Sequence, residues 1–258
     1  MRAVVVIPAR FGSKRFPGKP LAPIRGKPLI EHVYTRALEA KTVDRVIVAT
    51  DDSRILEAVS RFGGECVMTS ADHRSGSDRL GEVAGSIAAD VVVNVQGDEP
   101  LIDPGVIDAV VSVHESDLAP DIVTLAVPVV SQQDNTDRDV VKVVTDSRGF
   151  ALYFSRAAIP HGWQAGSGEA FRHIGIYAYA RKALMKFVSL PPARLEKTED
   201  LEQLRALENG MNIFVVRVDA FKGIGVDRPE DVTKVEDMMR EMEAGTVNAP
   251  HGRIEEEA

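Results

Sequence analysis

Short apolar runs alternate with helical patterns over the first 120 residues. The apolar runs, which are rich in valine and isoleucine, cover residues 3–7, 45–50, 65–68 and 91–95. Apolar side chains recur at helical spacing in the segments between them, at 28–40, 53–62 and 77–89. A strand that is apolar at nearly every position is buried on both faces, and such strands alternate with helices in parallel sheets. The pattern predicts an α/β fold with a mostly parallel central sheet flanked by helices.

The alternation of strand and helix patterns ends at about residue 120. Apolar stretches then follow one another closely, at 122–129, 140–146, 150–156 and 171–180. Their short spacing, with a turn at Asp146–Gly149, favours antiparallel strands in a smaller arm. A helix is expected at 199–210, a strand at 212–218 and a final helix at 229–245. The apolar stretch Val123–Val130 is a candidate for a dimer surface.

The composition narrows the possible partners. The 258 residues carry a net charge of −8, which argues against nucleic acid because binding its backbone needs a broad basic face. The single cysteine, Cys66, excludes an internal disulfide and is expected to pack in the core. No stretch approaches the ~20 apolar residues of a membrane helix, and the run at 3–7 is too short for a signal peptide. We therefore expect a cytoplasmic protein with no membrane partner.

Positive charge is concentrated near the N-terminus. Residues 2–29 contain seven basic residues and no acidic one. The loop after the first strand carries Arg10, Lys14, Arg15 and Lys19, with Gly12 and Gly18 between them. Glycine lets backbone N–H groups approach oxygen atoms closely, and arginine and lysine supply charge. Because open α/β sheets bind ligands beyond the carboxyl ends of their strands, the loop predicts a small phosphate-bearing ligand. The alternative is an ordinary solvated surface.

The loop does not match two common phosphate-binding motifs. Five residues separate Gly12 from Gly18, and Pro20 stands where a Walker loop has serine or threonine. The G-x-G-x-x-G pattern of dinucleotide-binding folds is also absent from the sequence. A GTP-type switch is therefore disfavoured.

Two aspartates are expected at the same edge of the sheet. Asp98 follows a strand in "VNVQGDEP", and Asp227 lies in the glycine-rich "FKGIGVDRPED". A carboxylate repels a triphosphate unless a cation such as Mg²⁺ lies between them and binds both. Both aspartates are therefore metal-binding candidates. The alternatives are that Asp227 caps a helix and that Asp98 only forms a turn.

Seven motifs together resemble the 3-deoxy-manno-octulosonate (Kdo) cytidylyltransferases. They are "VVIPARFGSKRFPGKPL", "MTSADHRSGSDRL", "VNVQGDEPLI", "VVKVVTD" followed by "ALYFSRAAIP", "RHIGIYAY", "LEQLR" and "GVDRPED", in order from about residue 3 to 240. The resemblance implies a glycosyltransferase-A-like nucleotidyltransferase fold, a homodimer and dependence on Mg²⁺. It implies the transfer of CMP from CTP to Kdo, with release of pyrophosphate, in lipopolysaccharide synthesis.

The resemblance also implies a domain plan. A single domain would span residues 1–245, with a nucleotide-binding part at 1–120 and a sugar-binding and dimerisation arm at 121–190. Residues 191–245 would return to the main part of that domain. The polar tail at 246–258 is expected to be flexible.

The same resemblance implies roles for individual residues. Arg10, Lys19 and Asp98 would be catalytic, and Asp98 and Asp227 would hold the metal. The nucleotide would be bound by Pro8, Ala9, Arg10, Ser13, Arg15, Lys19, Ser75, Gly76, Ser77, Arg79 and Asp98. The sugar acid would be surrounded by Gln96, Arg156, His173, Glu202 and Gln203. The segment 133–139 departs from the family pattern, being more acidic, which could alter the arm.

The residue types suit this chemistry on physical grounds. A forked guanidinium such as that of Arg156 pairs well with the carboxylate of a sugar acid. The alternation in "RHIGIYAY" places His173 and Gly175 on one face of a strand, although a lone strand histidine is usually a satisfied structural residue. Transfer by in-line attack needs alignment and charge neutralisation and no covalent nucleophile.

Two other functions stay open at this point. A cytidylyltransferase for another sugar acid, such as 8-amino-Kdo or sialic acid, would use the same loop and Asp98. The other is a non-catalytic nucleotide-sensing protein. Loss of Lys19, Asp98 or Asp227 would have favoured that function, but the sequence contains all three.

Overall fold

A computed structural model of the chain describes residues 1–13, 15–73, 75–165, 167, 170–221 and 223–245. Lys14 and the tail predicted at 246–258 lie outside the described residues. The described residues form two compact units, one of residues 1–108 with 223–245 and one of residues 109–221. Residues 191–221, expected to rejoin the nucleotide-binding part, belong to the second unit.

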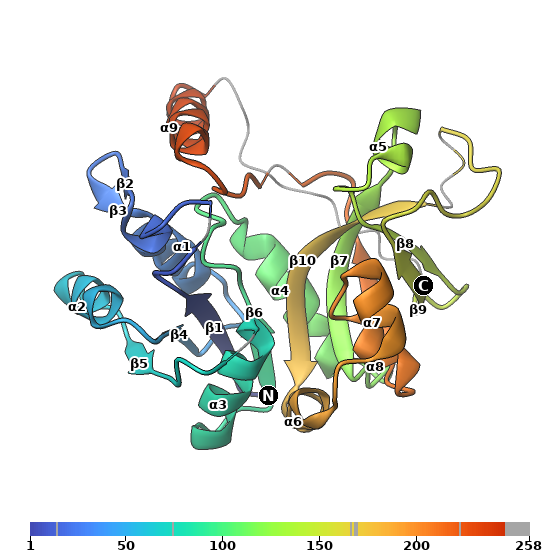
Figure 1. The fold of residues 1–258 in the computed structure, drawn as a ribbon, viewed down its shortest axis with the longest axis horizontal. Helices are drawn as coiled ribbons and strands as arrows, with labels where there is room; N and C mark the ends of the chain where they lie inside the picture. The colour runs from blue at the N-terminus through green and yellow to red at the C-terminus, as the bar shows by residue number, and fades with distance from the viewer. Residues whose placement is uncertain (14, 74, 166, 168–169, 222, 246–258) are drawn as a thin grey trace. The chain divides into compact units, whose positions relative to one another are not determined.

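The first unit is built on four parallel strands in the order β6-β1-β4-β5 (Figure 1). They are β1 (Ala3–Ala9), β4 (Arg45–Thr50), β5 (Cys66–Met68) and β6 (Val91–Asn94). The prediction of parallel strands is confirmed, and β1 continues past its predicted end through Pro8. Pro8 is tolerated there because pairing with β6 ends at Val6, so the side where its N–H is missing has no partner strand.

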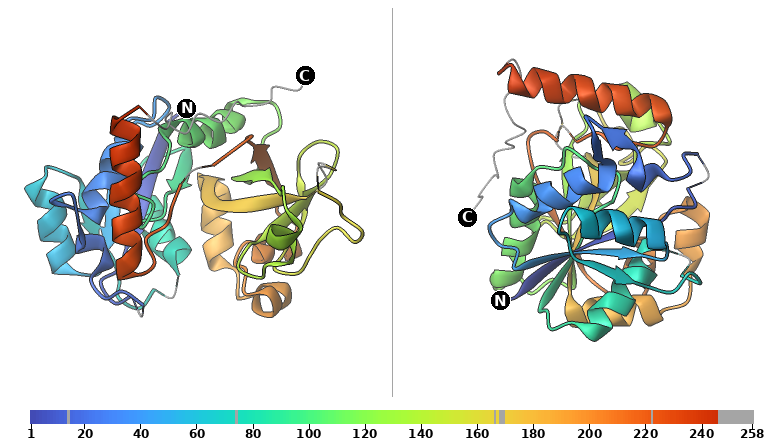
Figure 2. Two further views of the ribbon diagram at one scale, coloured as in Figure 1. Left: turned by 90° about the horizontal axis from the view of Figure 1, so that it is seen from above. Right: turned by 90° about the vertical axis from the view of Figure 1, so that its left-hand side faces the viewer.

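Helices pack against these strands as Figures 1 and 2 show, with α1 and α2 on β4, and α3 on β1 and β6. The helices of this unit are α1 (Leu29–Leu38), α2 (Ser53–Arg61), α3 (Gly76–Ser86) and α9 (Pro229–Glu243). The loop between β1 and α1 also contains the short helix η1 (Lys19–Leu21) and the hairpin strands β2 (Pro23–Ile24) and β3 (Lys27–Pro28). Pro28, predicted in the first helical turn, is instead the N-cap of α1.

The prediction missed the helix α4 (Pro104–Ser112), which continues into η2 (Val113–Glu115). A start signal is nevertheless present in the sequence. Asp103 accepts a hydrogen bond from the Gly105 N–H at 2.9 Å, and proline follows it at the first helical position. The nearly continuous apolar stretch of α4 hides the helical period.

The second unit has β7 (Ile122–Pro128) between β11 (Ile213–Arg217) and β10 (Phe171–Ala180). The strand β11 runs parallel to β7, and β10 runs antiparallel to it. The hairpin of β8 (Lys142–Thr145) and β9 (Ala151–Ser155) joins β10 through β8, so the antiparallel part is confirmed. The proposed dimer surface at Val123–Val130 is wrong for β7, because that strand is paired on both edges and only Pro128 is exposed.

The helices of the second unit are α5 (Gln132–Thr136), α6 (Arg181–Ser189), α7 (Arg194–Glu199) and α8 (Leu204–Glu208). The single helix predicted at 199–210 is wrong. Helix α7 ends at Glu199 and Asp200 adopts the left-handed conformation with φ 54°. The break places Glu202 and Gln203 in a connection between two short helices. In the described part of the chain, no helix has both the length and the apolar character needed to cross a membrane.

Candidate functional site

The centre of the site is one ammonium group between two carboxylates. Lys19 Nζ lies 2.7 Å from Asp98 Oδ2 and 3.5 Å from Asp227 Oδ1. Arg15 Nη2 lies 3.0 Å from the same oxygen of Asp227. The Lys19 side chain is only 14% exposed, whereas that of Asp227 is 49% exposed, so the cluster opens to solvent on the Asp227 side. The structure therefore brings together four residues that the sequence predicted to share a site.

The loop that carries Lys19 is folded around Phe11. The Phe11 carbonyl accepts hydrogen bonds from the N–H groups of Ser13 at 3.0 Å and Gly18 at 2.8 Å. Gly18 has φ 75°, and a Cβ there would lie 3.1 Å from the Phe11 ring. The guanidinium of Arg54 lies over the ring at 3.3 Å. Lys19 follows directly as the first residue of η1, so this packing fixes where its side chain starts.

Asp98 is placed by a close approach between two backbone segments. Gly97 follows β6, and a Cβ at this position would lie 2.9 Å from the Pro8 carbonyl oxygen. Only glycine lets the chain pass the end of β1 at this distance. The Asp98 carbonyl in turn accepts a hydrogen bond from the Val226 N–H at 2.9 Å. That bond joins the segment of Asp98 to the segment of Asp227.

Asp227 is not a helix cap, so the alternative raised for it is wrong. Arg228 is the N-cap residue of α9, and Asp231 accepts hydrogen bonds from the N–H groups of Asp227 at 3.1 Å and Arg228 at 3.0 Å. The hydrogen bond from Lys234, together with these two backbone bonds, lowers the pKa of Asp231. The Asp227 carboxylate is therefore left to face Lys19 and Arg15.

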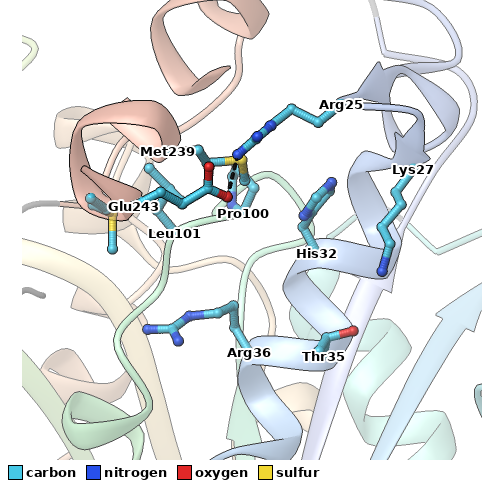
Figure 3. A pocket seen from close by; sticks show the side chains of 10 residues that line it. Arg25, Lys27, His32, Thr35, Arg36, Pro100, Leu101, Met239 and Glu243 are labelled. Carbon is cyan, nitrogen blue, oxygen red and sulfur yellow. Dashed lines mark hydrogen bonds and ion pairs between the residues drawn. The ribbon is translucent and has the colours of Figure 1, made fainter. Parts of the chain in front are cut away.

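Helix α9 is held in place at the tip of the β2–β3 hairpin (Figures 1 and 3). Arg25 donates from its backbone N–H to Glu236 at 2.8 Å and from its guanidinium to Glu243 at 2.5 Å. Arg25 and Glu243, drawn in Figure 3, line a cavity of about 480 Å³ together with Leu101 and Met239. None of the predicted site residues lines this cavity.

The carboxylates of Asp98 and Asp227 fit the role of two ligands to one Mg²⁺ ion. Asp98 and Asp227 already contact one cationic group in common, which shows that their oxygens converge. No group of three or more histidine, cysteine, aspartate or glutamate side chains in the described residues is arranged to hold a metal. Two carboxylates with phosphate and water oxygens suit Mg²⁺, which keeps several waters and is commonly bound through one or two carboxylates and substrate phosphates.

The N-terminus of α3 lies beside the start of the cationic loop. Ser75 caps it, accepting from the Asp78 N–H at 3.1 Å, and its own N–H donates to the Asp78 carboxylate at 3.1 Å. A Cβ at Gly76 would lie 3.4 Å from Pro8 Cγ. Ser75 and Gly76 are therefore at the same strand end as Pro8. Ser77 is buried in the first turn of the helix.

Arg79, another predicted nucleotide-binding residue, has a fully buried side chain although it is long and charged. Its guanidinium donates to Asp51 at 2.9 Å and to the Thr69 hydroxyl. Asp51 follows β4 and Thr69 follows β5, so Arg79 holds the ends of two neighbouring strands together. Its role in the structure is to support the edge of the sheet where the other residues lie.

The predicted sugar-binding residues other than Gln96 belong to the second unit. Gln96 is half-buried in the turn that contains Asp98, where its carbonyl accepts a hydrogen bond from the Glu99 N–H at 3.3 Å. Glu202 contacts Arg205 at 3.4 Å, and Gln203 is buried at the N-cap of α8. The Arg156 guanidinium binds three backbone carbonyls, those of Glu199, Arg138 and Asp200.

His173 is built into the sheet of the second unit. Its Nε2 lies 2.9 Å from the Thr124 hydroxyl, and its ring packs edge-on against Phe154 at 5.1 Å. Burial away from water lowers the pKa of His173 to about 3. The ring is therefore neutral at physiological pH and offers hydrogen bonds and no positive charge. His173 therefore has the structural role that the sequence analysis gave as the alternative, because its ring is hydrogen-bonded and packed within the sheet.

Three residues near the predicted sugar site were not identified from the sequence. Lys142 is fully buried in β8, Glu199 ends α7, and Thr124 lies in the middle of β7. Lys142 carried the one available signal, a single lysine inside the apolar run "VVKVV". A charged residue at such a position has to find partners on burial.

Comparisons with known proteins identify the family of the chain. The family model described as cytidylyltransferase matches residues 4–213. The 3-deoxy-manno-octulosonate cytidylyltransferase of Syntrophotalea carbinolica is 53% identical over 249 residues, covering 93% of this chain and 99% of the relative. An 8-amino-3,8-dideoxy-manno-octulosonate cytidylyltransferase of Shewanella sp. is 48% identical over 240 residues, covering 92% and 98%. The solved structure of a CMP:2-keto-3-deoxy-manno-octonic acid synthetase complexed with CTP aligns with a TM-score of 0.88 and 45% identity, covering 93% of this chain and 99% of that one.

Proposed function

The chain belongs to the 3-deoxy-manno-octulosonate cytidylyltransferase family, and from this premise we propose the reaction it catalyses. CMP is transferred from CTP to the anomeric hydroxyl of Kdo, which gives CMP-Kdo for lipopolysaccharide synthesis and releases pyrophosphate. The observation that carries the proposal is the contact of Lys19 with both Asp98 and Asp227 at the strand ends of the first unit.

The cationic loop binds and orients the triphosphate. Arg10 follows β1 directly, and Arg15 and Lys19 come from the same loop, so three positive charges can surround the phosphate oxygens. In the structure Lys19 and Arg15 contact carboxylates, and a phosphate of CTP would replace those partners with a stronger one. Lys19 and Arg10 then neutralise the charge that grows on the departing pyrophosphate.

Asp98 and Asp227 provide the acidic half of the site. They would hold Mg²⁺ against the phosphates, and the bound ion would supply Lewis-acid polarisation of the phosphate and lower the pKa of the attacking hydroxyl. The repulsion between carboxylates and triphosphate explains why the site needs a cation between them. Ser75 and Gly76, at the N-terminus of α3 beside Pro8, are placed to contact the nucleoside, as is Ser13 in the loop.

The sugar acid is recognised by charge and hydrogen bonds from the second unit. Arg156 pairs with its carboxylate, and Gln203 and the neutral His173 bond its hydroxyl groups. Glu202 of the second unit and Gln96 of the first unit are the other two residues proposed to bind the sugar. The specific candidate alternative to Kdo is 8-amino-Kdo, which is favoured by the 48% identity to the Shewanella relative named for that substrate.

The enzyme acts in the cytoplasm as a homodimer. We infer the homodimer from the family resemblance. The candidate for the dimer surface is not β7 but the exposed side chains near it, such as Val130, which is 73% exposed.

A pyrophosphate-release assay tests the proposal. Each of the four nucleoside triphosphates is combined with Kdo, 8-amino-Kdo or sialic acid, with Mg²⁺ and with EDTA. We expect release with CTP and Kdo in the presence of Mg²⁺, and none after chelation. Release with 8-amino-Kdo and not Kdo would move the substrate to the alternative, and release only with sialic acid would reject both.

A further inference from the structure

The side chain of Arg156 is held by three backbone carbonyls. Its Nε donates to the Glu199 carbonyl at 2.9 Å, Nη1 to the Arg138 carbonyl at 3.1 Å and Nη2 to the Asp200 carbonyl at 3.3 Å. A guanidinium has five N–H donors, so each terminal nitrogen has one more beyond the carbonyl that it binds. Two N–H groups on one planar group can bind both oxygens of a carboxylate.

The backbone of Arg156 is fixed just as firmly as its side chain. Glu199 Oε2 accepts a hydrogen bond from the Arg156 N–H at 2.9 Å, and Glu199 Oε1 accepts one from the Ser155 hydroxyl at 2.8 Å. The Arg156 carbonyl accepts a hydrogen bond from Lys142 Nζ at 2.7 Å. Glu199 therefore binds Arg156 twice, through its carboxylate and its carbonyl, while Lys142 binds it from β8.

Lys142 has no spare hydrogen-bonding capacity. Its side chain is fully buried, and Nζ also donates to the carbonyls of Asp137 at 2.7 Å and Val140 at 2.6 Å. Three donors meet three acceptors, which compensates for burying the charge. Because Arg156 Nη1 binds the intervening Arg138 carbonyl, the segment 137–140 is tied to Arg156 and Lys142 together.

The same frame reaches the residues predicted beside the sugar. Asp200, whose carbonyl binds Arg156 Nη2, has φ 54° and turns the chain out of α7. Glu202 and Gln203 follow within the connection that this turn begins. The Glu199–Asp200 segment thus fixes both Arg156 and the start of the connection that carries two more predicted sugar-binding residues.

We propose that Glu199 and Lys142 are positioning residues for recognition of the sugar acid, holding Arg156 so that its outer N–H groups meet the carboxylate of the substrate. The proposal rests on the proposed function, in which Arg156 binds that carboxylate. Neither residue touches the substrate. They hold Arg156 in its bound geometry before the substrate arrives. Less conformational entropy is then lost on binding, which is how a prearranged site gains affinity.

Steady-state kinetics of Glu199→Gln tests the proposal. The change keeps the size of the side chain but removes its charge and one of its acceptor oxygens. We expect the KM for Kdo to rise about 10-fold, on the scale of one weakened charged contact, while the KM for CTP and the kcat at saturating Kdo stay as in the wild type. Glu208→Gln is the matched control, because this carboxylate also binds a backbone N–H of α7, that of Leu195 at 2.8 Å, without contacting Arg156.

A double-mutant cycle with Arg156→Lys separates positioning from general stability. If Glu199 acts through Arg156, Glu199→Gln adds little to the KM for Kdo once Arg156 is lysine. Full additivity, or an equal rise in the KM for CTP, would overturn the proposal. Ser155→Ala, which removes one bond to the Glu199 carboxylate, decides the matter by the same KM measurements if Glu199→Gln does not fold.

Lys142 and the proposed function are tested separately. Lys142→Met leaves three carbonyls without their donor, and its KM for Kdo should rise at least as much as that of Glu199→Gln. An unchanged KM for Kdo in folded Lys142→Met would remove this residue from the proposal. An unchanged KM for Kdo in Arg156→Lys would contradict the proposed role of Arg156 itself. If the KM for Kdo rises in Arg156→Lys but not in Glu199→Gln, only the positioning by Glu199 is contradicted.

Discussion

Lys19 and Asp227, which lie near opposite ends of the chain, meet within 3.5 Å at a site that they share with Asp98. A buried ammonium between two carboxylates is a stable arrangement only while no stronger anion is present. A triphosphate with a divalent cation offers the lysine phosphate oxygens and the carboxylates a metal. The contact seen in the structure is therefore the arrangement expected before the substrates bind, with each charged group already at its place.

Replacing Lys19 by alanine is expected to lower kcat by about 10²–10³-fold, the scale of one lost transition-state contact. The effect arises because the ammonium would no longer neutralise the leaving pyrophosphate. Pyrophosphate release is measured at saturating CTP, Kdo and Mg²⁺, with Lys27→Ala as the control, since Lys27 pairs with Glu31 at 3.0 Å on the exposed side of α1. Activity above a tenth of the wild-type value would contradict the role of Lys19.

Removing either carboxylate is expected to weaken the binding of Mg²⁺. Asp98→Asn and Asp227→Asn each leave an oxygen but remove a charge, so a higher Mg²⁺ concentration should be needed for half-maximal rate, and Asp98→Ala should lose about 10²–10³-fold in kcat. A Mg²⁺ titration after treatment with EDTA measures this. Asp237→Asn, on the exposed face of α9, is the control. A titration curve unchanged in both asparagine variants would rule out the metal site.

Gly97→Ala is expected to destabilise the protein and to lower its activity. The new Cβ would lie 2.9 Å from the Pro8 carbonyl oxygen, a distance at which the backbone of β1 or of the Asp98 turn has to move. A cost of about 1–3 kcal/mol in the free energy of unfolding is expected for such overpacking. Urea unfolding measures the cost, and the KM for CTP reports the displacement of Asp98.

Gly85→Ala provides the control of opposite sign. Gly85 lies inside α3, and a Cβ there meets nothing within 4 Å. Alanine should stabilise this helix by about 0.5–1 kcal/mol, since it favours helical backbone over glycine. Equal effects of the two substitutions would show that the close approach at Pro8 is not the reason for glycine at position 97.

The parts of the site that the sequence predicted come from one rule of sheet geometry. Apolar runs at 3–7 and 91–95 identify parallel strands, and the loops that leave the carboxyl ends of parallel strands lie at one edge of the sheet. Lys19 and Asp98 could therefore be brought together from the sequence. Asp227 was named from its glycine-rich turn before a helix, but the strand rule does not place it, because its position depends on the docking of α9 onto the hairpin at Arg25, a contact between distant segments.

The parts that were missed depend on local choices that propensity does not reveal. The stretch at 199–210 is rich in glutamate and leucine, both good helix formers, yet Asp200 breaks it. That break is offset by a tertiary contact, because the Asp200 carbonyl then binds Arg156. The partners of Lys142 were equally hidden, since they are backbone carbonyls and leave no trace in residue type.

The buried neutral His173 gives the last prediction, a pH-dependent stability. Its pKa is about 3 in the folded protein and lies near 6.5 in an unfolded chain. Below pH 6.5 unfolding therefore takes up a proton, and the free energy of unfolding falls as the pH is lowered from 6.5 towards 3. The slope that this residue contributes approaches about 1.4 kcal/mol per pH unit.

Urea unfolding of the wild type and of His173→Gln between pH 5 and 7.5 measures this contribution. The window lies above the range where carboxylates titrate, and His114, whose pKa is also lowered by burial, contributes equally to both proteins. The variant should lose less stability on acidification than the wild type does. Parallel curves for wild type and His173→Gln would mean that the imidazole accepts a proton in the folded protein, and its neutral role beside the sugar would have to be abandoned.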